Sequence, residues 1–219
     1  MKKFVPLLVL SLMLSGQTIA QTPKGDIKNG PLTHTPESSL AVVSGAQIGL
    51  PASLTQAAIY VGTLQKAPAT PGPKVPVVVF MHGSSGLGLK AIAEWQQWLA
   101  GMGIASVAPD SFGLKDKLTY SSPIDKETYE KVHAMRASEI TLAVAALKQL
   151  PWADTSRMVL AGTSEGSVPV ARYTGKEFAG RIMFAWSCED NYFVTAHKTA
   201  IPDDQPTLNV ISSSDTYFS

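Results

Sequence analysis

One segment of the chain constrains the fold more than any other. Residues 74–81 read KVPVVVFM, an almost unbroken run of apolar and mostly β-branched side chains. A strand with one face in water alternates polar and apolar residues, whereas a strand without alternation is typical of a parallel sheet covered on both faces. Shorter runs of similar character at 103–108, 157–161, 181–186 and 207–211 predict further buried strands.

Helical patterns separate these strands. Residues 89–100 form one such pattern, with Trp95 and Trp98 on its apolar stripe, and residues 127–150 form a longer one that Pro151 ends. Alternating strands and helices predict an α/β fold with a mostly parallel central sheet and helices on both faces. In such a sheet the ligand binds beyond the carboxyl ends of the strands, so residues that directly follow strands are the first candidates for a site.

The N-terminus has the layout of a secretory signal peptide. Lys2 and Lys3 precede an apolar run over residues 5–14, and small residues follow up to Ala20. The run is shorter than the roughly 20 apolar residues that span a bilayer. An uncleaved anchor is the alternative. We expect residues 1–20 to be removed and the protein to be periplasmic or secreted.

Charge excludes two classes of partner. The chain has 18 Lys and Arg residues against 17 Asp and Glu residues, and both charged residues of the predicted signal are lysines. The mature chain is therefore nearly neutral, which gives no electrostatic basis for binding nucleic acid or an anionic membrane. We expect a small-molecule substrate, no cofactor and no metal.

The rest of the chain is interpreted as one domain. Residues 21–55 are rich in Gly, Pro, Ser and Thr, which favours an extended lead-in with one edge strand near residues 40–43. Residues 57–65 are predicted as a strand. We interpret residues 56–219 as a single α/β domain.

The sequence Gly162-Thr163-Ser164-Glu165-Gly166 follows the predicted strand at 157–161 and precedes a helical stretch. This is the G-x-S-x-G pattern of a nucleophile elbow, in which a sharp strand-to-helix turn lifts the serine oxygen above the sheet. Glycines leave room for the turn, and a helix N-terminus favours developing negative charge. The pattern predicts Ser164 as a nucleophile. A glycine-rich connecting turn is the alternative interpretation.

A second segment follows the strand at 74–81. Its sequence, His82-Gly83-Ser84, suits the loop that supplies one backbone N–H to an oxyanion hole, while the residue after the nucleophile supplies the other. We predict the N–H groups of Ser84 and Glu165 as these donors. His82 is interpreted as a structural residue that braces the loop.

The same loop has a rival interpretation as a phosphate-binding loop. Gly83 and Gly88 have the outer spacing of such a loop. However, Leu89 stands where a lysine is required. The sequence therefore disfavours a nucleotide site.

A third segment, SSSD at 212–215, follows the last predicted strand. In a Ser, acid, His triad of this chain order, the acid follows the nucleophile and orients the histidine. We predict Asp215 as the acid. Glu189 and Asp190, which follow the preceding strand, are the alternatives, and a turn aspartate without a catalytic role is the other interpretation.

Together these segments resemble the α/β-hydrolase superfamily, most closely its dienelactone-hydrolase-like branch, over about residues 57–219. The resemblance implies an eight-stranded, mostly parallel sheet and hydrolysis of a carboxylic ester or lactone. Ser164 departs from dienelactone hydrolases proper, which have cysteine at that position, and this leaves the lactone open as substrate. The residues that carry the resemblance are His82, Gly83, Asp110, Arg136, Glu139 and Ser164.

The resemblance breaks at the base of the triad. All four histidines, His34, His82, His133 and His197, precede Asp215, and His133 is predicted to lie on the surface. We expect the base beyond Ser219, on a chain truncated before its last strand and helix, with His197 as the alternative. An unassisted serine hydroxyl is a weak nucleophile, so the 219 residues are expected to be nearly inactive.

The unpaired Cys188 leads to a related hypothesis, a disulfide partner in the same missing tail. The loop over residues 111–123 is predicted to border the pocket, with Phe112 and Tyr120 as candidate lining residues and Phe193 at the next edge. Ordinary packing is the alternative for these three rings. A peptidase of the same fold and a non-catalytic exported binding protein remain as alternative functions.

Overall fold

The computed structural model describes residues 25–189, 191, 193–195 and 198–215. The predicted signal peptide over residues 1–20, the alternative acid Asp190 and the alternative base His197 therefore lie outside the described residues.

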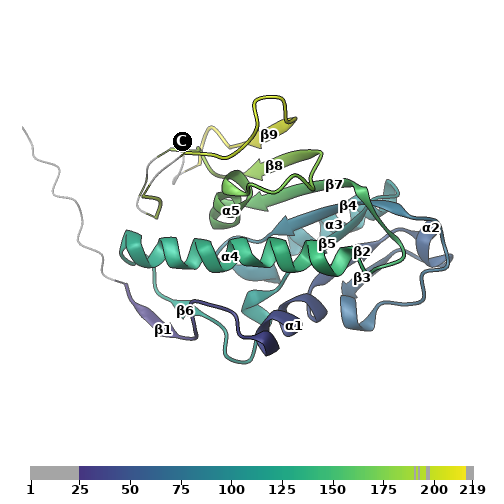
Figure 1. Cartoon of the computed structure of the whole chain (residues 1–219), viewed down its shortest axis with the longest axis horizontal. Coiled ribbons are helices and arrows are strands. Elements are labelled where there is room, and N and C mark those ends of the chain that lie inside the picture. The colour runs from purple at the N-terminus through teal and green to yellow at the C-terminus, as the bar shows by residue number, and fades with distance from the viewer. Residues whose placement is uncertain (1–24, 190, 192, 196–197, 216–219) are drawn as a thin grey trace, which may run out of the picture.

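The centre of the molecule is a seven-stranded sheet (Figure 1). Strand β2 pairs antiparallel with β3 and β5, and every other neighbouring pair in this sheet is parallel. This confirms the predicted α/β fold with a mostly parallel sheet. In spatial order the strands are β3 (Tyr60–Thr63), β2 (Gln47–Leu50), β5 (Ala105–Ala108), β4 (Val75–Met81), β7 (Ala153–Thr163), β8 (Gly180–Phe184) and β9 (Thr207–Val210).

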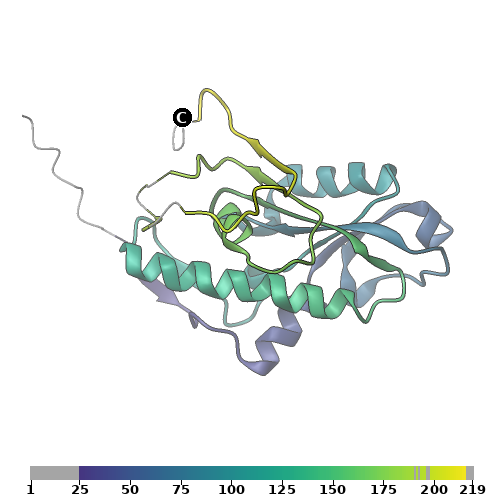
Figure 2. The ribbon, with the colours of Figure 1, turned by 45° about the horizontal axis from the view of Figure 1, so that its top comes forward.

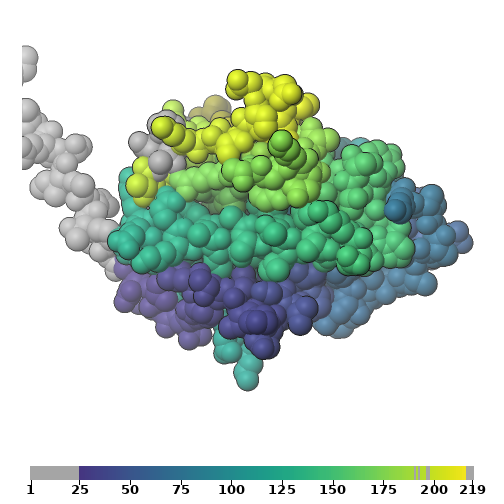
Figure 3. Space-filling model, in the orientation of Figure 1, coloured from purple at the N-terminus to yellow at the C-terminus, as the bar shows by residue number. Residues whose placement is uncertain are grey.

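Helices cover both faces of the sheet, as Figures 1 and 2 show from two directions. Helix α3 (Lys90–Gly101) packs on one face, while α4 (Lys126–Leu147) and α5 (Ser167–Arg172) pack on the other. Helix α1 (Pro36–Ser44) packs against the outer side of α4. In the space-filling view α4 runs as a continuous band across the face, with the N-terminal segments below it and the C-terminal segments above (Figure 3).

Smaller elements complete the fold. A separate two-stranded antiparallel sheet joins β1 (Ile27–Asn29) to β6 (Thr119–Tyr120), and α2 (Ala52–Thr55) is a single turn. None of the helices in the described part of the chain is long and apolar enough to cross a membrane. The short 3₁₀ turns are η1 (Leu64–Lys66), η2 (Gly86–Gly88), η3 (Ser111–Gly113) and η4 (Ser164–Gly166).

Helix α4 organises the larger of the two cores. Asp125 caps its N-terminus by accepting a hydrogen bond from the backbone N–H of Thr128 at 2.8 Å, and such a cap satisfies a donor that has no partner within the helix. Its apolar stripe, which includes Val132, Ile140 and Leu147, is buried against the sheet. The long helix predicted from the apolar period is confirmed.

The prediction of an extended lead-in is wrong for residues 36–50. The expected edge strand near 40–43 is part of α1, and β2 at 47–50 belongs to the central sheet. The reason is local. Thr35 and Ser38 form a capping box, with each side chain bonded to the other's backbone N–H, and Pro36 occupies the first helical position.

The stripe predicted for α3 is half right. Trp95 packs against Phe80 and Phe184 with ring centroids 5.2 and 5.9 Å apart. Trp98 is instead 59% exposed. Three positions along an α-helix turn by about 300°, so the two tryptophans lie about 60° apart around the helix axis, and only Trp95 faces the sheet.

Strand β9 forms one edge of the sheet, and all four of its residues are exposed. Leu208 and Val210 are 54% and 44% exposed. In the described part of the chain β8 is the only strand that pairs with it.

Candidate active site

The nucleophile elbow is present in the structure. Strand β7 ends at Thr163, Ser164 has a backbone φ of +51°, and a 3₁₀ turn leads directly into α5. Non-glycine residues are uncommon in this left-handed region, and such strain concentrates at functional sites. Ser164 is partly exposed, so the turn holds a serine in an unfavourable conformation where solvent reaches it.

The glycines around the elbow are needed for close packing. A Cβ added to Gly166 would lie 2.2 Å from the carbonyl oxygen of Met81 and 2.5 Å from that of His82. A Cβ on Gly83 would lie 3.2 Å from the Cβ of Ser164. The elbow is therefore packed directly against the end of β4 and the loop that follows it.

A buried polar network holds this loop in place. The Nη2 group of Arg136 donates to the carbonyl oxygen of His82 at 2.9 Å, and His82 Nδ1 lies 2.8 Å from the carbonyl oxygen of Gly83. Burial, reinforced by the positive charge of Arg136, holds the pKa of His82 well below its usual value. A neutral, enclosed histidine fits the predicted role as a brace of the loop.

The network continues away from the elbow. Arg136 Nε lies 3.1 Å from Glu139 Oε2, and Glu139 Oε1 lies 2.9 Å from Nε2 of His34. The side chains of Arg136 and Glu139 are 1% and 0% exposed, so each charge requires the other. This chain of contacts links the segment before α1 to the loop after β4.

Ser84, Ser164 and Glu165 line one small cavity of about 30 Å³. The structure thus brings together the predicted nucleophile and both residues predicted to supply oxyanion donors. The other lining residues are Tyr120, Ser122, Tyr129 and Phe193.

The Glu165 carboxyl group is buried beside the nucleophile. It is 4% exposed, and its Oε2 accepts a short hydrogen bond from the hydroxyl of Tyr120. Burial is the main cause that raises the pKa of Glu165 above its usual value. The sequence predicts a role only for the backbone N–H of Glu165. Its side-chain role depends on a residue 45 positions away, which no local pattern reveals.

A second cavity of about 540 Å³ adjoins the first, since Ser84 and Tyr120 line both. Phe112 lines the larger cavity and Phe193 the smaller one. The predicted border loop over residues 111–123 therefore contributes to the walls of both cavities, and all three candidate aromatic residues are lining residues.

Polar and charged side chains also reach the larger cavity. Asp110 and Lys117 line it together with Leu118. Burial raises the pKa of the Asp110 carboxyl group, although the group accepts a hydrogen bond from the N–H of Gly113 at 2.8 Å.

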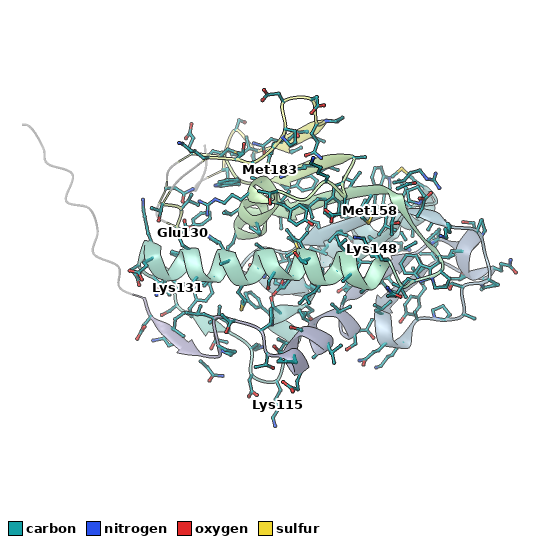
Figure 4. The ribbon with its side chains drawn as sticks, viewed as in Figure 1. Lys115, Glu130, Lys131, Lys148, Met158 and Met183 are labelled. Atoms are coloured by element: carbon teal, nitrogen blue, oxygen red, sulfur yellow. The ribbon has the colours of Figure 1, made fainter. Side chains whose placement is uncertain are left out.

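The prediction that His133 lies on the surface is wrong. It is 3% exposed, and its ring packs beside those of Tyr129 and Phe193, with centroids 6.1 and 5.9 Å away. Burial is the main cause that lowers the pKa of His133 to about 4, against the opposing effect of Glu130. Figure 4 labels Glu130 on the side of α4 that faces the C-terminal segments.

None of the described histidines lines the cavity at Ser164. His34 and His82 belong to the network on α4, and His133 lies within the aromatic cluster. The structure therefore does not bring a base together with Ser164 among the described residues.

The candidate acid lies at the same end of the sheet as the nucleophile. Strands β7, β8 and β9 are parallel, and Asp215 follows β9 in a turn where its N–H donates to Ser212 at 3.0 Å. Glu189, the alternative acid, is exposed in the segment after β8. The described residues do not include a histidine that either carboxylate would orient.

Cys188 lies near this end of the sheet as a free thiol, with the side-chain amide of Asn209 3.9 Å from its sulfur. Burial raises the pKa of the thiol. The disulfide hypothesis stays a prediction.

No protein-family model and no curated protein sequence matches this chain. Solved structures do match. A structure titled m3DLH gives a TM-score of 0.48 at 21% identity, over 69% of this chain and 63% of that chain. A cold-adapted esterase from an Arctic intertidal metagenomic library gives 0.43 at 17%, over 59% and 55%. Est1E from Butyrivibrio proteoclasticus gives 0.39 at 21%, over 52% and 41%.

The chain spans less than two thirds of the length of each of these three structures. Their TM-scores lie below 0.5, so the fold assignment rests on this chain's own strand order. That order defines an α/β fold with a mostly parallel central sheet and a strained serine at the end of a central strand.

Proposed function

We propose that this protein is an exported serine hydrolase of the α/β-hydrolase superfamily, of its dienelactone-hydrolase-like branch, which cleaves a carboxylic ester or lactone. The observation that carries the proposal is the geometry at Ser164. A φ of +51° at the end of β7 places the serine in a cavity that Ser84 and Glu165 also line. Gln56, Ala185 and Cys188 have a similar φ. What sets Ser164 apart is that its turn joins β7 directly to the 3₁₀ turn before α5 and packs against the loop after β4.

In the proposed mechanism Ser164 attacks the carbonyl carbon of the substrate. The backbone N–H groups of Ser84 and Glu165 donate hydrogen bonds to the oxyanion, which stabilises the tetrahedral intermediate. A histidine takes the serine proton and returns it to the leaving alkoxide. Water then attacks the acyl-enzyme, with the same histidine as base, and releases the acid and the free serine.

The base is the part of this mechanism that the described residues do not supply. We propose a histidine outside them, oriented by Asp215, since Asp215 follows a strand at the same end of the sheet. If this histidine lies outside the 219 residues, they alone will hydrolyse p-nitrophenyl acetate hardly faster than buffer, because Ser164 then has no assistance. Enzymatic turnover by these residues that Ser164→Ala abolishes would refute that assignment.

A fluorophosphonate probe tests the nucleophile directly. The probe forms a phosphorus–oxygen bond to an activated serine with loss of fluoride, and intact mass and peptide mapping locate it. In the protein isolated from its own cells, which carries the proposed base, we expect labelling at Ser164 that Ser164→Ala abolishes. All labelling experiments below use this protein. Ser44→Ala, a surface change on α1, serves as the matched control and should leave labelling intact.

Two other functions make different predictions. A peptidase of this fold would label in the same way but cleave anilides and peptides at rates comparable to those for esters. A non-catalytic binding protein would leave Ser164 unlabelled in the complete protein. We rank the ester hydrolase first because the described residues form no additional domain that would select peptides.

The exported location is part of the proposal and rests on the sequence of residues 1–20 alone. Mass spectrometry of the secreted or periplasmic protein should find Gln21 as the first residue. An intact N-terminus in a membrane fraction would show that the segment is an anchor.

A further inference from the structure

The side chain of Glu165 leaves one oxygen without a partner. Tyr120 donates to Oε2, whereas Oε1 is buried and accepts no hydrogen bond from any described residue. A buried carboxyl oxygen without a partner destabilises a protein by roughly 1–3 kcal/mol. Such groups are rare in folded proteins and call for an explanation. Among the described residues with such an atom, Glu165 is the one that lines the cavity at Ser164.

The cavity that Glu165 lines is small and polar. Besides Ser164 and Glu165, four of its lining residues carry a hydroxyl group. The remaining lining residue, Phe193, contributes an apolar ring. Ser122 and Tyr129 are hydrogen-bonded to each other at 2.5 Å. A volume of about 30 Å³ holds roughly one or two water-sized groups. The cavity therefore suits a short group that forms hydrogen bonds and excludes a long alkyl chain.

The neighbouring cavity differs in size. It has a volume of about 540 Å³. Ser84 and Tyr120 line both cavities. A substrate bound across Ser164 would place a short acyl part in the small cavity and its larger leaving group in the second. Tyr120 and Ser84 lie where the two cavities adjoin.

We propose, on the basis of the proposed function, that Tyr120 and Glu165 form a recognition pair that binds a hydroxyl group on the carbon next to the scissile carbonyl. The substrate class is then an ester of a short 2-hydroxy acid with a bulky alcohol. A hydroxyl both donates and accepts hydrogen bonds, and so does a neutral carboxyl group, which the raised pKa of Glu165 favours.

Two anilides of equal size test this recognition without requiring turnover. The first is 2-hydroxy-N-phenylacetamide, called hydroxyacetanilide here, with its hydroxyl on the carbon next to the carbonyl. The second, propananilide, has a methyl group in place of that hydroxyl. The phenyl ring of each represents the leaving group. The measurement is the concentration of each that halves the rate of fluorophosphonate labelling at Ser164. We expect hydroxyacetanilide to protect at a concentration about tenfold lower, since a well-placed hydrogen bond contributes roughly this factor.

A matched pair of variants separates recognition from general effects. Tyr120→Phe keeps the ring and removes the hydroxyl that orients Glu165, and we expect the tenfold preference to fall to about twofold or less. Tyr173→Phe removes a second tyrosine–glutamate hydrogen bond, which joins Tyr173 to Glu177 at 3.0 Å. Neither of these two residues lines either cavity. This control should keep the tenfold preference.

The outcomes distinguish this inference from the function on which it rests. Labelling at Ser164 with equal protection by both anilides would overturn the recognition pair and leave the serine hydrolase intact. A preference that survives Tyr120→Phe would overturn the role of Tyr120. No labelling at Ser164 in the complete protein would overturn both proposals together.

Discussion

Replacing Gly166 by alanine probes the contact on which the site depends. The new Cβ would lie 2.2 Å from the carbonyl oxygen of Met81 and 2.5 Å from that of His82. Both are backbone atoms, so the clash is relieved only if the elbow moves away from the end of β4. Overpacking of this kind destabilises a protein by about 1–3 kcal/mol, and we expect a value at the upper end of that range.

Gly101 provides the matched control. It lies at the end of α3, and a Cβ added there would have no other atom within 4 Å. Gly101→Ala should therefore stabilise the protein by roughly 0.5 kcal/mol, because alanine restricts the unfolded chain. The same chemical change is thus expected to have opposite signs at the two positions.

The assay is urea unfolding at pH 7, followed by circular dichroism, with fluorophosphonate labelling of Ser164 as a second readout. Gly166→Ala should lower the unfolding midpoint and slow labelling, since the donors at Ser84 and Glu165 move apart. A Gly166→Ala protein with the unfolding midpoint and labelling rate of the original chain would refute the packing of the elbow against β4.

Two further predictions concern buried rings. The pKa of His133 is lowered from 6.5 to about 4, so the folded state favours the neutral ring, and stability is full above pH 6.5 and falls as the pH drops from there to 4. The free energy of unfolding should fall by about 3 kcal/mol over this range, at roughly 1.4 kcal/mol per pH unit. Urea unfolding at pH 7 and 4.5 should show a smaller fall for His133→Phe than for the original chain. Equal falls would contradict the assignment. Trp95→Ala should destabilise the protein by ~2 kcal/mol because the Trp95 ring contacts two phenylalanines. Trp98→Ala, at a 59% exposed position, should change the urea unfolding midpoint little. Similar effects of the two variants would place both rings in the core.

Local sequence was sufficient where the determining contacts are local. The unalternating run at 74–81 predicted β4, and the glycine pattern around Ser164 predicted the strained turn. Residues 40–43 were misinterpreted because four apolar residues suit a strand or a helix. The capping signals at Thr35 and Pro36 decide the matter and were present in the sequence.

Contacts between distant segments were beyond local patterns. His133 is buried because Phe193, sixty positions later, covers it. The hydroxyl of Tyr120 on β6 donates to the Glu165 carboxyl group in the elbow. Both contacts join segments that are far apart in the sequence, which periodicity within a single helix does not encode.

The exposed edge strand β9 determines how firmly Asp215 is held. Local stability follows burial, and the four residues of β9 are exposed while the elbow strand β7 lies in the middle of the sheet. Amide hydrogens of β9 should therefore exchange with solvent long before those of β7. Among the strands that the structure describes, the carboxylate proposed to orient the base is thus attached to the most exposed one. A partner that pairs with β9 would hold Asp215 more firmly and so sharpen the geometry of catalysis.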